Sequence, residues 1–318
     1  MGRKSKNSFV IQGSILAFAG ILVRILGLIY RIPLTRILGD EGNGYYSTAY
    51  DIYNVLILLS SQSMPLAVSK IVSEKLERRQ YKNAYKIFKG ALFYGAVLGV
   101  LFGLFAFLGA DWLATSVYKS QPAAVALKVL APTLTVACIL GVMRGFFQGM
   151  GNMIPTAISQ IFEQIVNAVV SVIAAYELTV YGVSISKMSK LGESAGPAYG
   201  AAGGTLGTLT GANAALIIVV IVFWNSYGNI KKPIRKDKTK VEDSYATITK
   251  VIIFTITPVL ISSTIYNISN LLDNPIYGNI VTGIFDVSSK TRAELWGVYS
   301  AKYRVLTTMP IAIASSLS

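Results

Sequence analysis

Two arginines lie inside an apolar stretch near the N-terminus, and they are the residues of this sequence best suited to bind an anion. The stretch from Ser14 to Gly39 reads SILAFAGILVRILGLIYRIPLTRILG, and it places Arg24 and Arg31 seven residues apart. Seven residues are about two helical turns, so both guanidinium groups share one helix face. A central arginine costs about 2.5–3.5 kcal/mol even on the lowest insertion scale. An anion site would explain this cost, and so would an internal ion pair with Asp51 or Glu163.

Glycines on nearly the same helix face indicate where the arginines point. Gly13, Gly20 and Gly27 also recur every seven residues, and small residues mark close helix packing in bilayers. The two arginines are therefore expected to face the bundle or a wet cavity and not lipid. Pro33 and Pro65 interrupt apolar helices and, together with Gly27, are the expected hinges.

A second polar group occupies one face of another apolar segment. Gln160, Glu163, Gln164 and Asn167 follow the spacing i, i+3, i+4, i+7 in ISQIFEQIVNAVV, which is one stripe of a helix. Such a stripe faces water or polar partners, so these four residues are predicted to line the same cavity as the arginines.

Three further charged residues have two possible roles. Asp51 is either a salt-bridge partner or an ion site, and Arg304 with Lys302 either faces the cavity or anchors its helix at the interface. The third arginine of the opening stretch, Arg36, is interpreted as a boundary residue. A cluster of tyrosines beside Asp51 fits an aromatic interface belt, namely Tyr45, Tyr46, Tyr50 and Tyr53.

The composition indicates that helices spanning a membrane position these residues. Of 318 residues, 53% are hydrophobic and only 14% are charged, against about 25% charged in soluble domains. The net charge of +14 does not indicate nucleic-acid binding here, because the basic residues lie between apolar runs. We predict an all-α bundle with about eight spans, at roughly 9–34, 45–72, 87–110, 123–147, 154–181, 201–224, 247–271 and 296–318.

The distribution of lysine and arginine predicts the orientation of these spans. Seventeen lie in segments that should share one side of the membrane, which are the N-terminus, 73–89, Arg144 and 225–250, and six lie on the other side. Because cytoplasmic loops carry the excess of positive charge, the N-terminus is predicted to be cytoplasmic.

Several kinds of chemistry lack their residues in this sequence. It has no histidine and a single cysteine, Cys138, so histidine-based zinc sites, catalytic triads and disulfide frameworks are not expected. The phosphate-binding loop of ATPases is also missing. We therefore expect no enzyme activity, no metal and no cofactor, and leave a coupling ion open.

Two segments carry a resemblance to a known family. FAGILVRILGLIYRIPLTRILGDEGNGYYSTAYDIYNVLILLSSQSMPLAVSK and GVMRGFFQGMGNMIPTAISQIFEQIVN resemble the polysaccharide-biosynthesis flippases of the multidrug/oligosaccharidyl-lipid/polysaccharide (MOP) exporter superfamily, in its MurJ-like, SpoVB-like and YtgP-like branch. The resemblance implies about 14 helices in two MATE-type lobes that alternate access to a central cavity. It also implies that cavity arginines meet a pyrophosphate. The family's R-x-L-G element matches Arg24 to Gly27, its next arginine aligns with Tyr30 or, after a one-residue shift, Arg31, and a later one matches Arg304 approximately.

The resemblance also predicts how the chain is divided. Residues 1–225 would form a six-helix lobe, 226–246 a basic cytoplasmic linker, and 247–318 the first two helices of a second lobe. The similar motifs MPLAVS at 64–69 and MPIAIA at 309–314 support a repeat between the lobes. The sequence is therefore expected to be part of a longer transporter.

The leading hypothesis is a flippase of the bacterial cytoplasmic membrane. It would move an undecaprenyl-pyrophosphate-linked, lipid II-like cell-wall precursor to the outer leaflet without an ATPase of its own. The alternatives are a MATE-type cation or drug antiporter, a teichoic-acid, capsular or sporulation-specific glycan flippase, and a scaffold for cell-wall enzymes. The expected partners are the lipid-linked oligosaccharide pyrophosphate, anionic membrane lipids and cell-wall synthesis proteins, and nucleic acid is not expected.

Overall fold

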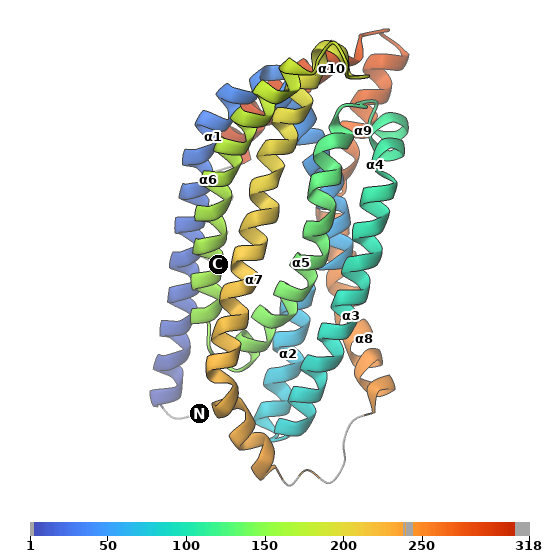
Figure 1. The fold of residues 1–318 in the computed structure, drawn as a ribbon. Coiled ribbons are helices and arrows are strands. Elements are labelled where there is room, and N and C mark those ends of the chain that lie inside the picture. The colour runs from blue at the N-terminus through green and yellow to red at the C-terminus, as the bar shows by residue number, and fades with distance from the viewer. Residues whose placement is uncertain (1–2, 238, 240–243, 309–318) are drawn as a thin grey trace.

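The computed structural model describes residues 3–237, 239 and 244–308, and none of these residues forms a strand. The all-α prediction is therefore confirmed. Short π-helical turns occur at Leu113–Val117 and at Tyr299–Tyr303. The helices are α1 (Arg3–Ser60), α2 (Met64–Glu77), α3 (Tyr81–Leu108), α4 (Ala110–Trp112), α5 (Ala123–Gly149), α6 (Ile154–Ser184), α7 (Ala195–Lys236), α8 (Tyr245–Tyr266), α9 (Ile268–Gly283) and α10 (Ser289–Val298) (Figure 1).

Helix α1 is two helices joined at a kink. Its 58 residues would extend about 87 Å if straight, far more than the roughly 30 Å of a bilayer core. Gly39 breaks the helix with φ 64°, a value that glycine adopts without steric cost. The Asn43 amide donates to the carbonyls of Thr35 and Gly39, which the break would otherwise leave unpaired. The first two predicted spans therefore both lie in this element and α2.

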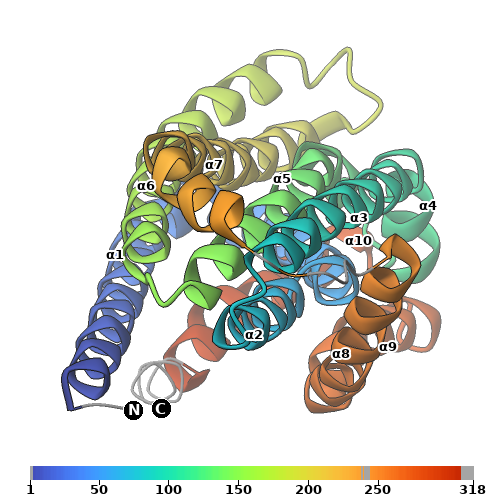
Figure 2. The ribbon, with the colours of Figure 1, turned by 90° about the horizontal axis from the view of Figure 1, so that it is seen from below.

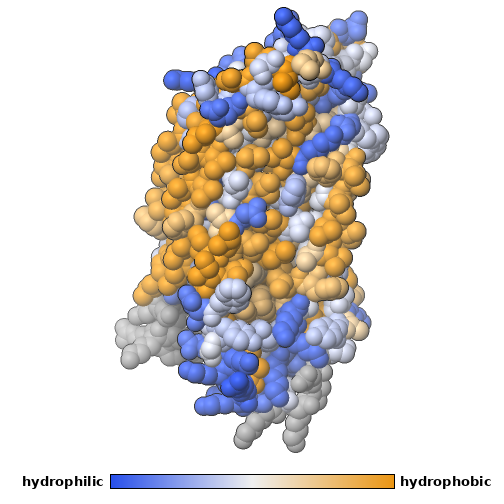
Figure 3. Space-filling model, in the orientation of Figure 1, coloured by the Kyte–Doolittle hydropathy of each residue, from blue (hydrophilic) through white to orange (hydrophobic). Residues whose placement is uncertain are grey.

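The bundle has the surface of a multi-pass membrane protein. Six stretches of described residues are long and apolar enough to cross a membrane, and the first of them, Ile11–Glu77, is 67 residues long and includes the break at Gly39. Figure 3 shows an apolar band between two polar ends. The prediction of a polytopic helical bundle is confirmed.

Proline and glycine determine where helices begin and how closely they pack. The predicted span 45–72 is interrupted at residues 61–63, and α2 starts there with Pro65 in its first turn, where proline is tolerated. Along α7, a Cβ on Gly207 would lie 2.6 Å from the Asn167 carbonyl oxygen, and one on Gly211 would lie 2.6 Å from that of Glu163. Helices α6 and α7 can therefore approach closely only because these positions are glycine.

The later elements differ in detail from the predicted spans. Helix α7 runs to Lys236, so residues 226–236 of the predicted linker are helical. The predicted span 247–271 is divided, because α8 ends at Tyr266 and α9 follows it. Figure 2 shows α8 and α9 on the opposite side of the bundle from α6 and α7. Residues 309–318 of the last predicted span, with the MPIAIA motif, lie outside the described residues.

The tyrosines after Gly39 are part of the protein core. Tyr45, Tyr46 and Tyr53 are buried, with exposed fractions of 1%, 5% and 6%, and they pack with α5 and α7 residues in one cluster. The prediction of an aromatic interface belt is therefore wrong at these positions. The period of the tyrosines matches a buried helix face as well as an interfacial one, so the sequence could not separate the two.

Candidate functional site

A carboxylate–guanidinium pair joins the second half of α1 to the helical turn that follows Tyr299–Tyr303. Arg304 Nη1 lies 3.4 Å from Asp51 Oδ1, and the two side chains are 27% and 8% exposed. The residues are 253 positions apart, so the pair connects the first helices of the chain to the last described ones. The prediction left Asp51 open between a salt bridge and an ion site. The structure shows a salt bridge, and the role as an ion site stays a prediction.

The second oxygen of Asp51 is held by a buried polar network. Asn274 of α9 donates from Nδ2 to Asp51 Oδ2 at 2.8 Å and to Thr48 Oγ1 at 3.3 Å. Arg292 donates from Nη2 to Asn274 Oδ1. Its guanidinium is fully buried and lies 5.8 Å from the centre of the Tyr277 ring. Asp51 thus receives an arginine directly on one oxygen and, through Asn274, a second arginine on the other.

A cavity of about 250 Å³ adjoins this pair. Its wall combines both charged groups with three polar side chains, Asn54, Gln62 and Asn267, and with two apolar ones, Ile57 and Leu58. Such a mixture can hold a charged or strongly polar group, because its charge and hydrogen bonds find partners there. The cavity is the candidate site.

The other two predicted arginines lie on the first half of α1. Arg31 lines a groove of about 310 Å³ whose opposite wall consists of Ala301, Lys302, Val305 and Leu306. It also lies within electrostatic reach of the Tyr46 and Tyr50 hydroxyls. Arg24 is half-buried two turns before it. The structure thus separates the predicted cluster, with Arg304 at the cavity, Arg31 at the groove and Arg24 on neither wall.

The polar stripe of α6 faces other helices. Exposed apolar residues, Phe162, Ile165 and Val169, occupy its opposite face. Glu163 accepts from Arg144 Nη2 at 2.8 Å, and Arg144 Nε donates to Ser159 at 3.0 Å.

The remaining members of the stripe also have protein surroundings. Asn167 contacts Tyr30 of α1 at 3.5 Å and accepts from Ser171 at 2.9 Å. Gln164 lies against Gly27, where an added Cβ would be 3.3 Å from its Nε2 atom, and Gln160 is half-buried. The stripe joins α6 to α1, α5 and α7, and none of its four residues lines the cavity beside Asp51.

The predicted hinge residues have three different settings. Gly27 packs on α6, Pro65 starts α2, and Pro33 lies within α1, while the break in α1 is at Gly39. The seven-residue glycine stripe is not a uniform packing surface either, because a Cβ on Gly13 would meet nothing within 4 Å among the described atoms.

One end of the bundle is closed by backbone contact between α1 and α10. A Cβ on Gly44 would overlap the Ala293 carbonyl, and one on Gly297 would overlap the Asp40 carbonyl. Lys302 pairs with Asp40 at 2.7 Å, and Ser300 donates to Ser47 at 2.7 Å. The Asp51 cavity therefore lies beneath a tightly closed end.

Sequence reasoning missed several residues of this region. The distribution of positive charge assigns Arg144 and, on the opposite side, Arg292 only a role in topology, although Arg144 pairs with Glu163 and Arg292 belongs to the buried network beside Asp51. Asn274 and the rest of α9 lie in ISNLLDNPIYGNIVTG, whose polar residues and proline hide a helix from a hydropathy window. Within the described part of the chain, no group of three or more His, Cys, Asp and Glu could hold a metal ion.

The fold and this site define a class: a polytopic helical membrane protein with the architecture of MATE-type transporters. An inward-facing multidrug-resistance MATE transporter of the MOP superfamily superposes with a TM-score of 0.59 over 95% of this chain and 60% of that one, at 15% identity.

Residues 10–318 match the family described as polysaccharide biosynthesis protein, and the chain belongs to that family. It is 26% identical to stage V sporulation protein B of Bacillus subtilis, over 99% of this chain and 57% of the relative. It is 27% identical to the lipid II flippase MurJ of the same organism, over 69% of this chain and 40% of the relative. The chain thus spans about half the length of the curated relatives it matches.

Proposed function

We propose that this chain belongs to a flippase that moves a lipid-linked glycan precursor across the membrane. The observation that carries the proposal is the Asp51–Arg304 pair on the wall of a polar cavity between the first and the last described helices. Membership of the polysaccharide biosynthesis family and similarity to the lipid II flippase MurJ support transport of a glycan-bearing lipid.

The pair suits an anionic group that enters the cavity and leaves again. Without substrate, Asp51 neutralises Arg304 and spares it the large penalty of an unpaired charge in the membrane. A pyrophosphate offers several oxygens to a guanidinium, which binds such groups through two parallel hydrogen bonds. Substrate and Asp51 therefore compete for Arg304, and release of the substrate restores the resting ion pair.

This competition couples substrate binding to movement of the last described helices relative to α1. Asp51 on α1 contacts both Asn274 of α9 and Arg304. A substrate that draws Arg304 away therefore removes one of the contacts between α1 and the last described helices. A ligand shifts such an equilibrium only through contacts that differ between the two states. Arg31 and Arg24 on the first half of α1 would extend the cationic path, and turnover would use the substrate gradient, the membrane potential or a coupled ion.

The finer assignments are part of the same proposal. The substrate is an undecaprenyl-pyrophosphate-linked precursor of the lipid II type, moved from the cytoplasmic to the outer leaflet of the bacterial cytoplasmic membrane, with the N-terminus inside. The lobes are 1–225 and 247 onward, joined by 226–246. A teichoic-acid, capsular or sporulation-specific glycan is the nearest alternative, since stage V sporulation protein B aligns with nearly the whole chain.

A MATE-type cation antiporter is the less favoured function. It needs a carboxylate that an incoming cation can reach, whereas both candidate carboxylates already face an arginine, Asp51 at 3.4 Å from Arg304 and Glu163 at 2.8 Å from Arg144. An arginine beside each carboxylate repels a cation and attracts an anion.

The test is transport of a fluorescent undecaprenyl-pyrophosphate lipid in proteoliposomes containing the protein or its Arg304→Gln variant. Loss of transport by about tenfold or more is expected, because charge-assisted pairs to an anion contribute about 1.5–3 kcal/mol. Lys290→Gln is the matched control, since Lys290 forms an exposed pair with Glu193 at 3.8 Å and lines neither the cavity nor the groove. Equal activity of wild type and Arg304→Gln would reject the role of the pair, and efflux of a cationic dye without lipid transport would favour the antiporter.

A further inference from the structure

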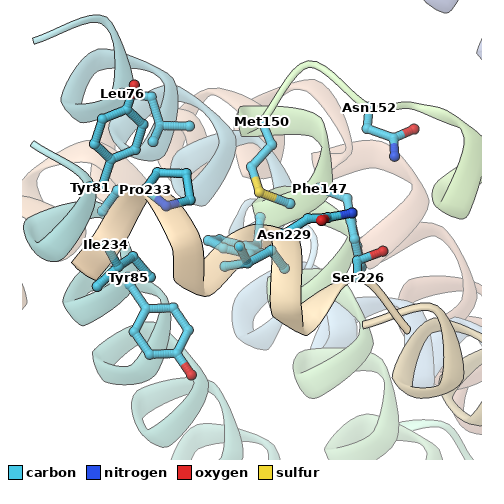
Figure 4. A pocket seen from close by; sticks show the side chains of 13 residues that line it. Leu76, Tyr81, Tyr85, Phe147, Met150, Asn152, Ser226, Asn229, Pro233 and Ile234 are labelled. Carbon is cyan, nitrogen blue, oxygen red and sulfur yellow. The ribbon is translucent and has the colours of Figure 1, made fainter. Parts of the chain in front are cut away.

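A second cavity, of about 390 Å³, lies at the end of the bundle opposite α10. It is enclosed by the end of α2, the start of α3, the end of α5 and the last three turns of α7. Figure 4 shows Tyr81 and Tyr85 of α3 on one side, Phe147 and Met150 of α5 on the other, and α7 passing between them with Asn229 and Pro233. The volume is within the range of small-molecule sites, about 300–1,000 Å³.

The lining of this cavity suits a hydrocarbon chain with a polar end. Aromatic and aliphatic side chains form most of the wall, and the polar lining groups are carboxamides and hydroxyls without a carboxylate. Asn229 is exposed at the mouth, and Phe147 is buried at the far side. Polarity therefore increases from the inner wall toward the surface, as it does along an amphiphile.

Two lysines lie next to residues that line the cavity, Lys89 over the Tyr85 ring and Lys231 directly after Ile230. Lys89 Nζ lies 4.9 Å from the centre of the Tyr85 ring, and Lys231 Nζ lies 5.4 Å from that of Tyr227. Tyr85 lies on α3 and Tyr227 on α7, so each of the two helices that border the cavity carries one of these ammonium groups. Both lysines are exposed, and aromatic rings hold each in position.

The position of the cavity along the bundle indicates that the ligand is a membrane lipid. The ends of α3 and α7 lie where the apolar band gives way to a polar surface (Figures 1 and 3), so the cavity is at the depth of lipid headgroups. The segments 73–89 and 225–236 add to the positive charge at this end. A basic segment at the membrane surface attracts anionic lipid by about 1 kcal/mol per Lys or Arg.

We propose that this cavity binds one anionic phospholipid of the adjacent leaflet. An acyl chain lies against Phe147, Met150 and Tyr81, and the phosphodiester lies between Lys89 and Lys231. This site is separate from the Asp51 cavity, and the proposal does not depend on which substrate is transported. Because the end of α7 forms one wall and leads directly into the segment toward α8, a bound lipid fixes the start of that connection against α3.

Native mass spectrometry of the purified protein in detergent tests the proposal, with phosphatidylglycerol and phosphatidylcholine titrated separately. The protein is expected to retain one phosphatidylglycerol in preference to phosphatidylcholine. Lys89→Gln with Lys231→Gln should weaken retention by about thirtyfold, from about 1 kcal/mol per lysine. Asn229→Trp, a change at an exposed position, should block the mouth of the cavity and abolish retention.

Lys187→Gln with Lys190→Gln is the matched control, because it removes two exposed lysines from the loop between α6 and α7 at the other end. This control should retain phosphatidylglycerol like the wild type. Equal loss in both lysine pairs would reduce the effect to net charge, and equal retention in all variants would refute the site. Equal binding of phosphatidylcholine, or competition by soluble glycerol phosphate as strong as by the lipid, would also overturn it.

Discussion

Two arginine–carboxylate pairs lie inside this bundle, and they differ in what they connect. Arg144 and Glu163 are 19 positions apart on the neighbouring helices α5 and α6, at 2.8 Å. Arg304 and Asp51 are 253 positions apart, at 3.4 Å, and adjoin a cavity. The first pair joins consecutive helices, whereas the second joins the beginning of the chain to its last described helices.

The surroundings of the two pairs indicate different roles. Arg144 also donates to Ser159, one helical turn before Glu163 on α6, so its fork is anchored to a single helix. Asp51 instead takes hydrogen bonds or charge from three separate segments, through Asn274, Arg304 and, behind Asn274, Arg292. A pair between adjacent helices stabilises the packing of those two helices. A pair between distant segments can break and form again when the segments move. The Arg144 pair is therefore expected to affect stability, and the Asp51 pair transport.

Neutralising each carboxylate gives the largest expected contrast. Asp51→Asn keeps the shape of the side chain but leaves Arg304 without its counter-charge, and removing one partner of a buried pair costs about 3–5 kcal/mol. Lipid transport per folded protein should fall by about 100-fold or more. Glu163→Gln should lower transport only as far as it lowers the amount of folded protein. The measurement is proteoliposome transport normalised to monodisperse protein, and the reverse ranking would contradict the assignment.

Three of the four members of these pairs could be predicted from the sequence, but their pairing could not. Asp51, Glu163 and Arg304 were each predicted from charge inside an apolar run, because such a charge needs a reason to be there. Nothing in the local sequence states that a residue at 304 meets one at 51, since that contact depends on how the later helices return to the first. Arg144 and Arg292 were missed because a cation near a helix end satisfies a topology rule equally well.

The fold was more predictable than the site for a related reason. Hydrophobic length and lysine distribution are local properties, and they led to the helical bundle and to most span positions. The break at Gly39 falls in the interval 35–44 between the first two predicted spans, whereas α1 continues helically through Pro33, which was the predicted hinge. Helix α9 was missed because its packing on α1, through Asn274, compensates for a polar sequence.

Removing both members of a pair together should separate stability from function with a smaller effect. Arg144→Met with Glu163→Leu replaces the ion pair by apolar groups, a change that is often neutral or stabilising. It should restore most of the roughly 3–5 kcal/mol lost in Glu163→Gln, and transport should recover with it. Asp51→Leu with Arg304→Met should likewise recover its melting temperature, but not transport. Thermal unfolding and the transport assay, run on the same preparations, measure stability and function. Recovered transport in Asp51→Leu with Arg304→Met would contradict the assignment of this pair to transport.

Two glycines extend the same contrast to backbone contacts. A Cβ on Gly44 would overlap Ala293 of α10, and one on Gly203 would overlap Ala174 of α6, and overpacking costs about 1–3 kcal/mol. Gly203→Ala should lower the melting temperature, because α6 and α7 pack along their length. Gly44→Ala should instead loosen the closed end.

Cysteine labelling reads out that second effect. A cysteine at Ser47, which accepts a hydrogen bond from Ser300 at the closed end, should react several-fold faster with a thiol reagent in Gly44→Ala than in Gly203→Ala. The native Cys138 is buried and gives a low background. Equal labelling in both variants would show that the α1–α10 contact does not separate.

The smallest expected effect concerns an acidic residue that is not in a buried pair. The Asp237 carboxylate, just after α7, accepts from the backbone N–H of Lys82 at 2.7 Å, in the first turn of α3. Partial burial opposes its ionisation, but hydrogen bonds from Lys82 and Thr239 outweigh that effect and lower the pKa of Asp237. A lowered pKa means that the stabilisation is complete above the ordinary aspartate value of about 3.9 and is lost as pH falls through the folded-state value.

Asp237→Asn should therefore cost only about 0.5–1 kcal/mol at neutral pH, like the loss of a helix cap. The difference in stability between this variant and the wild type should become smaller in acid. Thermal unfolding between pH 7 and pH 3 measures this gap, and a gap that widens toward pH 3 would show that the carboxylate does not act through its charge.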